Sequence, residues 1–120
     1  MVTRRQRRVS SLIREEISVL LQREVADPRL DFVTVTDVET SADLGQVHIY
    51  VTFLGDAQKQ KESLEVLRRA TGFLRRQLGQ KVHLRYVPDL TFRLDPSVER
   101  GQRIERILQE LENSREQSEE

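Results

Sequence analysis

Residues 67–78 read LRRATGFLRRQL, from Leu67 to Leu78. On an ideal helix, with 100° between successive residues, the apolar side chains of this stretch and of the residues just before it share one face. The central line of that face consists of Leu64, Leu67, Thr71, Leu74 and Leu78. The pattern predicts an amphipathic helix, from about Ala57 to Gly79, that packs against a core.

The polar face of the same helix is basic and contains a glycine. Gly72 falls among four arginines: Arg68, Arg69, Arg75 and Arg76. A glycine inside a helix costs about 1 kcal/mol relative to alanine, so we expect the helix to break at residues 70–72 and Gly72 to have a conformational role. The bare backbone would let a phosphate approach closely. A continuous helix with a solvated basic face and a tolerated glycine explains the stretch equally well.

Composition limits the class of protein. The chain has 120 residues, enough for one domain with a sizeable core. It has no cysteine, which excludes disulfides and thiolate metal sites and suits a reducing compartment. It has no long apolar run, and its first residues are too polar for a signal peptide. We therefore expect a soluble, cytoplasmic protein with no membrane partner.

The charges are balanced overall, 20 basic against 20 acidic, but they are unevenly placed. Five arginines precede the first acidic residue, Glu15, and residues 66–88 contain six bases and no acid. The last eleven residues, by contrast, contain five glutamates and only one basic residue, Arg115. Two basic zones favour a polyanionic partner.

Periodicity predicts the other elements. Alternating patterns indicate two strands that form a hairpin, and Pro88 indicates a bulge or an edge position in a third. Asp56 is the expected N-cap of the second helix. In chain order we expect a helix at 4–24, strands at 32–39 and 46–53, the interrupted helix at 57–79, an extended segment at 82–94 and a short helix with Ile104, Ile107, Leu108 and Leu111. Residues 1–112 would form one domain, and 113–120 an acidic, disordered tail.

The first six elements give an α+β fold with the order of a type II KH domain: helix, strand, strand, helix, kinked helix, strand. The short C-terminal helix is an addition. In KH domains, a GxxG loop between the second and third helices clamps a nucleic acid backbone. That loop is missing here, and Ala70-Thr71-Gly72 stands in its place.

The sequence around these elements resembles the ribosome-binding factor A family, which are bacterial assembly factors of the small ribosomal subunit. The resemblance covers about residues 4–111. Its segments are Arg8-Val9, Glu15-Glu16-Ile17, Asp27-Pro28-Arg29-Leu30, residues 33–38, Ser41-Ala42-Asp43-Leu44, residues 47–51, residues 70–75, Leu84-Arg85, residues 88–92, and Asp95, Ser97 and Glu99 ahead of Arg103-Ile104.

The resemblance implies a KH-like fold with a kinked helix. It also implies binding to the free small (30S) subunit and 16S rRNA, late in subunit maturation and in processing of the 16S rRNA 5′ end, with a link to growth in the cold. The family's motif alanine and glycine correspond to Ala70 and Gly72. With the basic zones, the candidate RNA-binding residues are Arg4, Arg5, Arg7, Arg8, Arg68, Arg69, Ala70, Thr71, Gly72, Arg75, Arg76, Lys81 and Arg85.

Other chemistry finds little support in the sequence. His48 and His83 lack metal-ligand spacing, and four aspartates lie at strand ends and turns, where aspartate forms local hydrogen bonds. No phosphate-binding loop, dinucleotide fingerprint or nucleophile motif is present. The chain has only six aromatic residues, so we expect base stacking to matter less than phosphate contacts. We expect a monomeric, non-catalytic RNA-binding module without metal or cofactor and with no DNA partner. The alternatives are a small metal-dependent nuclease acting on precursor rRNA and an adaptor that binds only protein.

Overall fold

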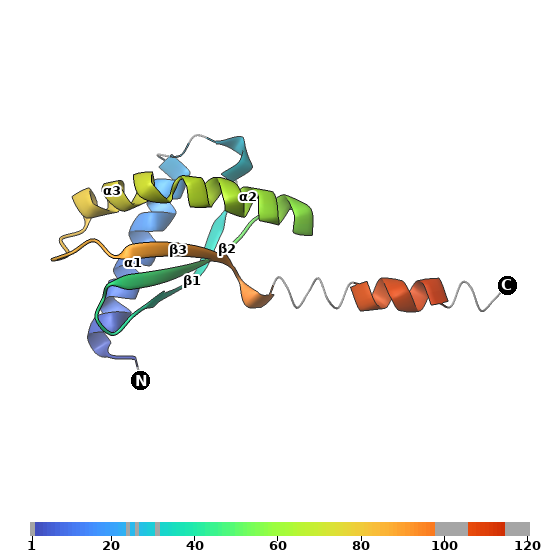
Figure 1. Ribbon diagram of the computed structural model, residues 1–120, viewed down its shortest axis with the longest axis horizontal. Helices are drawn as coiled ribbons and strands as arrows, with labels where there is room; N and C mark the ends of the chain where they lie inside the picture. Colours follow the sequence, from blue (N-terminus) through green and yellow to red (C-terminus); the bar gives the residue numbers. More distant parts are fainter. Residues whose placement is uncertain (1, 24, 26, 31, 98–105, 115–120) are drawn as a thin grey trace.

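The computed structural model describes residues 2–23, 25, 27–30, 32–97 and 106–114. Its elements are α1 (Arg4–Arg23), a 3-10 turn η1 (Pro28–Leu30), β1 (Thr34–Thr40), β2 (Gln46–Thr52), α2 (Ala57–Arg69), α3 (Thr71–Lys81) and β3 (Asp89–Leu94). The fold is α+β and KH-like, as predicted: three helices pack against a three-stranded sheet (Figure 1).

Helix α1 begins with a reciprocal cap that periodicity did not reveal. The Gln6 N–H donates to the Thr3 hydroxyl at 3.1 Å, and the Thr3 N–H donates to Gln6 Oε1 at 2.8 Å, which forms a capping box. Gln6 Nε2 also donates to the Thr40 carbonyl at 2.9 Å and so joins the helix to β1. Apolar side chains at helical spacing form a buried stripe along α1, namely Val9, Ile13, Ile17, Leu20 and Leu21, whereas Leu12 is 39% exposed.

The sheet has the order β1-β2-β3, with β1 and β2 antiparallel and β2 and β3 parallel. The parallel pair requires a crossover, which α2 and α3 supply. The inward residues of β2, including Val47, Ile49 and Val51, are fully buried. The hairpin prediction is confirmed, but the first strand starts at Thr34 and not at Phe32, because Phe32 has φ of +63°, which no strand accommodates.

The third strand is shorter than predicted. Residues 82–88 form a loop, and β3 begins at Asp89, directly after Pro88. A proline has no N–H to donate to a neighbouring strand. β3 is an edge strand, as the proline indicated.

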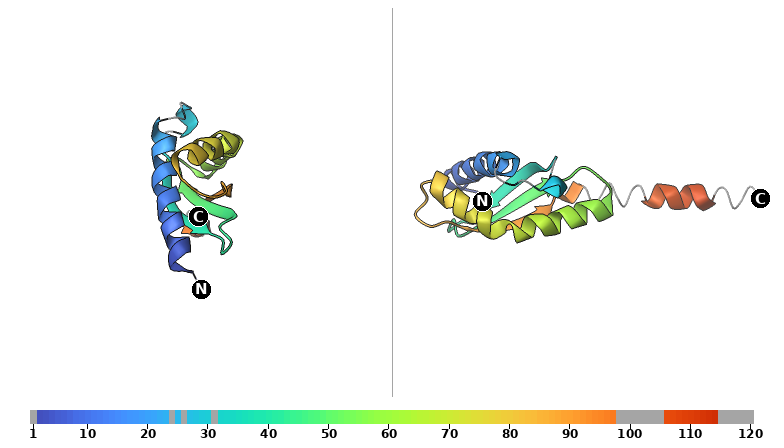
Figure 2. Two further views of the ribbon diagram at one scale, coloured as in Figure 1. Left: turned by 90° about the vertical axis from the view of Figure 1, so that its left-hand side faces the viewer. Right: turned by 90° about the horizontal axis from the view of Figure 1, so that it is seen from above.

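The interrupted helix is confirmed. Asp56 caps α2, accepting the Lys59 N–H at 2.8 Å. Gly55, with φ of +128°, makes the turn before it. α2 ends at Arg69, and α3 begins at Thr71 and continues to Lys81, two residues past the predicted end. Figure 2 shows the change of direction between them from above. The leucines of the predicted apolar line are buried on the inner faces of α2 and α3: Leu64, Leu67, Leu74 and Leu78.

Residues 106–114 form a helix that stands away from the domain (Figure 1). Its apolar side chains, Ile107, Leu108 and Leu111, are each more than half exposed and add nothing to the core. The helix extends through residues 113 and 114, the start of the predicted tail. Ile104 and residues 115–120 lie outside the described residues. Within the described ranges, no helix is long and apolar enough to cross a membrane.

Candidate nucleic-acid interface

The junction between α2 and α3 is formed by Ala70. Its N–H donates to the carbonyls of Val66 at 3.3 Å and Leu67 at 3.0 Å, and its own carbonyl accepts the Leu74 N–H at 3.0 Å. As the N-cap of α3, Ala70 has no side-chain oxygen to accept a hydrogen bond from the first turn. The first amides of a helix lack intrahelical partners and carry its partial positive charge. The start of α3 therefore presents uncapped donors.

Gly72 lies in this first turn, and its role differs from the prediction. The one described glycine with positive φ is Gly55, so the backbone at Gly72 is one that any residue adopts. A Cβ built at Gly72 would meet nothing within 4 Å. The expected conformational role is therefore wrong. What the missing side chain provides is access, because a ligand can reach the backbone of the first turn of α3.

Two of the four predicted arginines are directed to the sheet. Arg68 donates from Nε and Nη2 to the Phe92 carbonyl at 3.4 and 3.3 Å, and its Nη1 is 3.4 Å from Glu65 Oε1. Arg75 donates to the carbonyls of Pro88 at 3.1 Å and Val87 at 2.8 Å. These hydrogen bonds give partners to carbonyls of β3 and of the loop before it. An edge strand has carbonyls that no neighbouring strand pairs with. Arg68 and Arg75 thus hold the helices against β3, a role that helical periodicity did not separate from phosphate binding.

The other two arginines remain available. Arg69 and Arg76 are exposed, and neither forms an ion pair or a side-chain hydrogen bond within the part of the chain that the structure describes. Arg69 lies three residues before Gly72 and Arg76 lies four residues after it, spacings that make residues neighbours on a helix surface. Ala70, which joins the two helices, keeps backbone angles in the right-handed helical region. The result is a stripe, Arg69–Gly72–Arg76, with two unpaired guanidinium groups flanking exposed backbone.

A hollow of about 500 Å³ adjoins this stripe. It is lined by Gly72, Arg75, Arg76, Arg85, Tyr86 and Val87. The chain therefore brings the predicted Arg85, from the loop before β3, next to Gly72. Lys81 is exposed in the last turn of α3 but does not line this hollow. Tyr86 was not a predicted site residue, because an isolated aromatic in a loop gives no periodic signal.

A second basic hollow, of about 600 Å³, lies between α2 and β3. Its lining includes Lys61, Arg68 and Arg93, of which the first and the last were not predicted. The spacing of Lys61, Leu64 and Arg68 on α2 could have revealed Lys61, because it places these residues along one line. Arg93 could not be found this way, since its proximity depends on the pairing of β3.

The N-terminal arginines form a separate zone. Arg4, Arg5, Arg7 and Arg8 are exposed on the first turns of α1. These turns lie at the bottom of Figure 1 and of the left view of Figure 2, whereas α2 and α3 run across the top.

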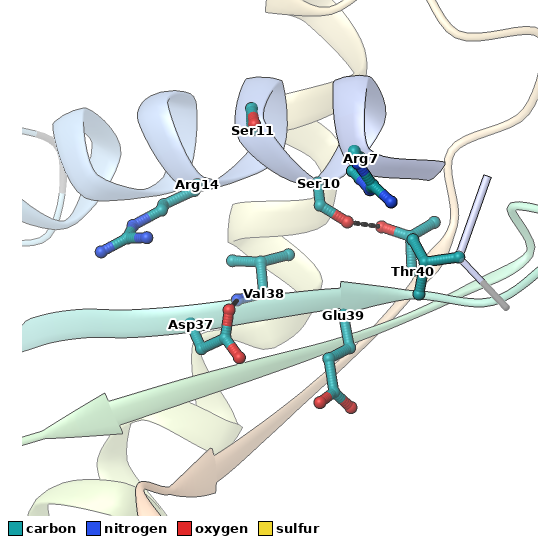
Figure 3. Close-up of a pocket in the computed structure, with 9 residues that line it drawn as sticks. Arg7, Ser10, Ser11, Arg14, Asp37, Val38, Glu39 and Thr40 are labelled. Carbon is teal, nitrogen blue, oxygen red and sulfur yellow. Dashed lines mark hydrogen bonds between the residues drawn. The ribbon is translucent and has the colours of Figure 1, made fainter. Parts of the chain in front are cut away.

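Figure 3 shows that the hollow of about 720 Å³ beside the N-terminal zone mixes charges. Arg7 and Arg14 on α1 share it with Asp37 and Glu39 on β1, and the Ser10 and Thr40 hydroxyls are 2.7 Å apart. This hollow is less suited to an anion than the α3 hollow, whose lining contains no acid.

The four aspartates at strand ends and turns each have a hydrogen-bond or ion-pair partner. Hydrogen bonds from the Ser41 hydroxyl, at 2.6 Å, and from the Gly45 N–H, at 2.9 Å, lower the pKa of Asp43. Asp37 accepts the Val38 N–H, and Asp89 lies 3.6 Å from Arg75. Hydrogen bonds from Thr36 and Ser97 lower the pKa of Asp95. No group of three or more metal-ligating side chains occurs among the described residues.

Element order, the parallel β2–β3 pair and the broken helix at Ala70 define the chain as a type II KH-like domain without a GxxG loop. A family model described as ribosome-binding factor A matches residues 5–108. A ribosome-binding factor A from Desulfitobacterium hafniense is 42% identical over 119 residues, which covers 99% of this chain and 95% of the relative. The chain therefore belongs to the ribosome-binding factor A family.

Solved structures support the same assignment. A Thermotoga maritima protein, solved in solution by NMR, has a TM-score of 0.68 and 36% identity, covering 78% of this chain and 89% of its own. A homology model of Thermus thermophilus ribosome binding factor A, fitted into a cryo-EM map of a 30S complex, has a TM-score of 0.56 and 27% identity, covering 78% of this chain and 93% of its own.

Proposed function

We propose that this protein binds the free small ribosomal subunit through phosphates of 16S rRNA, as a non-catalytic assembly factor. It acts as a monomer in the cytoplasm, late in subunit maturation and in processing of the 16S rRNA 5′ end. The relative fitted into a 30S complex supports the target. The observation that carries the proposal is the stripe Arg69–Gly72–Arg76: two arginines without described partners beside backbone that no side chain covers.

The chemistry of the stripe suits phosphate. A guanidinium group stays charged at all physiological pH values and holds a phosphate through two parallel hydrogen bonds. The uncapped amides of α3 add donors at the positive end of the helix dipole. Arg68 and Arg75 contribute indirectly. Their hydrogen bonds hold α2 and α3, which carry the stripe, against β3 and the loop before it.

The test is a charge reversal, Arg69→Glu together with Arg76→Glu, followed by sedimentation with purified small subunits over a range of salt concentrations. Both side chains are exposed and form no described hydrogen bond or ion pair, so the melting temperature should stay close to that of the parent. Binding should weaken strongly, and the log–log salt slope should fall by about 0.7 to 0.9 for each phosphate that the variant no longer neutralises.

The matched control is Arg5→Glu together with Arg8→Glu, which makes the same change of charge on α1. If the α1 variant loses binding and the helix-pair variant does not, then the N-terminal zone contacts the rRNA, and the stripe does not. If neither variant changes the salt slope, binding does not depend on phosphates, which favours the adaptor that contacts only protein.

The nuclease alternative has its own assay. The parent protein, incubated with precursor 16S rRNA and increasing Mg²⁺ or Mn²⁺, should leave the RNA intact. Metal-dependent cleavage that purifies with the protein would contradict a non-catalytic role.

A further inference from the structure

Tyr86 is an exposed aromatic residue on a fixed platform. Its side chain is 73% exposed, although burial of a tyrosine ring is normally favourable. The loop is held at the residues after it, where Arg75 donates to the carbonyls of Val87 and Pro88. Val87 also packs over Gly79, where an added Cβ would come within 2.8 Å of Val87 Cγ2. The ring is therefore displayed by a braced segment.

The surroundings of the ring are cationic. The Arg85 guanidinium carbon is 5.6 Å from the centroid of the Tyr86 ring, within the range of a cation–π contact. Tyr86 lines the hollow of about 500 Å³ together with Gly72, Arg76 and Arg85, and no acidic side chain lines it. A flat aromatic surface, the guanidinium groups of Arg76 and Arg85, which form no ion pair among the described residues, and uncovered backbone thus line one concave site.

We propose that this hollow binds one unpaired nucleotide of RNA, with its base stacked on Tyr86 and its phosphate held by Arg76 beside Gly72. The inference rests on the proposed function and specifies its ligand as unpaired RNA at this point. A base within a duplex is stacked on both faces and cannot reach the ring, whereas a splayed base can stack on an aromatic side chain. A peptide could supply an aromatic ring but would lack the phosphate that the arginines match.

The proposal adds one stacked base to the expectation that phosphate contacts outweigh stacking. That expectation depended on the small number of aromatic residues, and a count does not show where they lie. A single exposed ring beside unpaired arginines is sufficient for one stacked base, and stacking tolerates any base because each has a π-face.

The test compares Tyr86→Leu with Tyr86→Phe, using a fluorescently labelled, unstructured RNA nonamer and, as the paired control, a blunt-ended RNA duplex without unpaired bases. Binding is followed by fluorescence anisotropy at several salt concentrations. The leucine variant should bind the nonamer about 5- to 150-fold more weakly, the usual range for one stacked base, with an unchanged salt slope. The phenylalanine variant keeps the ring and should bind within about 2-fold of the parent. Neither change should affect binding of the duplex.

Two controls make the result specific. Phe32→Leu removes another exposed aromatic, 77% exposed, which does not line this hollow, and should leave nonamer binding unchanged. Arg76→Glu should weaken the binding of both RNAs and lower the salt slope.

Three results would count against the proposal. If the leucine variant binds the nonamer as well as the parent does, Tyr86 does not stack a base, and the proposed function stands. If the leucine variant weakens binding of the nonamer and of the duplex equally and alters the salt slope, Tyr86 acts only by placing Arg85, which also overturns the stacking site. If the parent binds neither RNA nor the small subunit, the proposed function fails and the inference with it.

Discussion

Replacing Gly72 with alanine should stabilise the protein while weakening its binding to the small subunit. The structure gives the sign of the first effect. Gly72 has no positive φ and lies in a helix, and its added methyl group would contact nothing within 4 Å. Alanine restricts the unfolded chain and has a higher helix propensity. The gain in free energy of unfolding should be about 0.4–1 kcal/mol, which raises the melting temperature by roughly 1–5 °C.

The second effect has the opposite sign because the methyl group covers the amides that the stripe exposes. If it blocks one charge-assisted hydrogen bond from the backbone to a phosphate, binding loses about 1.5–3 kcal/mol. This loss corresponds to roughly a 10- to 150-fold increase in Kd for the small subunit. The combination separates a blocked backbone from general destabilisation, which would lower stability and binding together.

Gly79→Ala is the matched control, because it makes the same change in the same exposed helix. There the new Cβ would lie 2.8 Å from Val87 Cγ2, so the loop before β3 must shift. This variant should gain less stability than Gly72→Ala, or lose some. The assays are thermal unfolding by circular dichroism and sedimentation with small subunits. A Gly72→Ala protein that is more stable and binds as the parent does would refute close approach to the backbone. A less stable one would refute the helical geometry.

Arg75→Met should lower the free energy of unfolding by about 1–2 kcal/mol in urea titrations, because two carbonyls of the loop before β3 lose a charged donor. Arg76→Met, at the neighbouring position without a described partner, should change it by less than about 0.5 kcal/mol, and equal losses would contradict the bracing role. The pKa of Asp43 is lowered by Ser41 and the Gly45 amide, so its stabilisation is complete above the unfolded value of about 3.9 and disappears as pH falls through the lower folded value. Asp43→Asn should therefore flatten the fall in urea midpoint below about pH 5, and a curve parallel to that of the parent would show that the turn is not linked to pH. A chain ending at residue 113 should melt within about 1–2 °C of the full chain, since residues 113–120 have no apolar side chain to bury. A much larger loss would indicate that the tail docks on a basic zone.

Much of the fold follows from local sequence patterns. The leucines from Leu64 to Leu78 share a helical face, and β2 alternates as a half-buried strand does, so the elements and their buried sides could be predicted. The edge position of β3 after Pro88 also has a local cause, a proline without an N–H to donate. The break was expected because of Gly72, but it falls at Ala70, and Gly72 itself lies inside α3. The alternating pattern predicts a strand that begins at Phe32. Phe32 instead lies in the turn before β1 and has a positive φ, which the pattern does not reveal.

What the sequence by itself determined is which side chains share a face: the apolar line of α2 and α3, the basic face opposite, and the family to which the chain belongs. It did not distinguish Arg68 and Arg75, which meet β3, from Arg69 and Arg76, which remain unpaired among the described residues. Only the tertiary structure made that distinction, placed Tyr86 beside Gly72 and separated the N-terminal arginines from α3. The reason is physical: helical and strand periods arise from residues two to four apart, whereas the partner of a face depends on how the crossover returns the chain to the sheet.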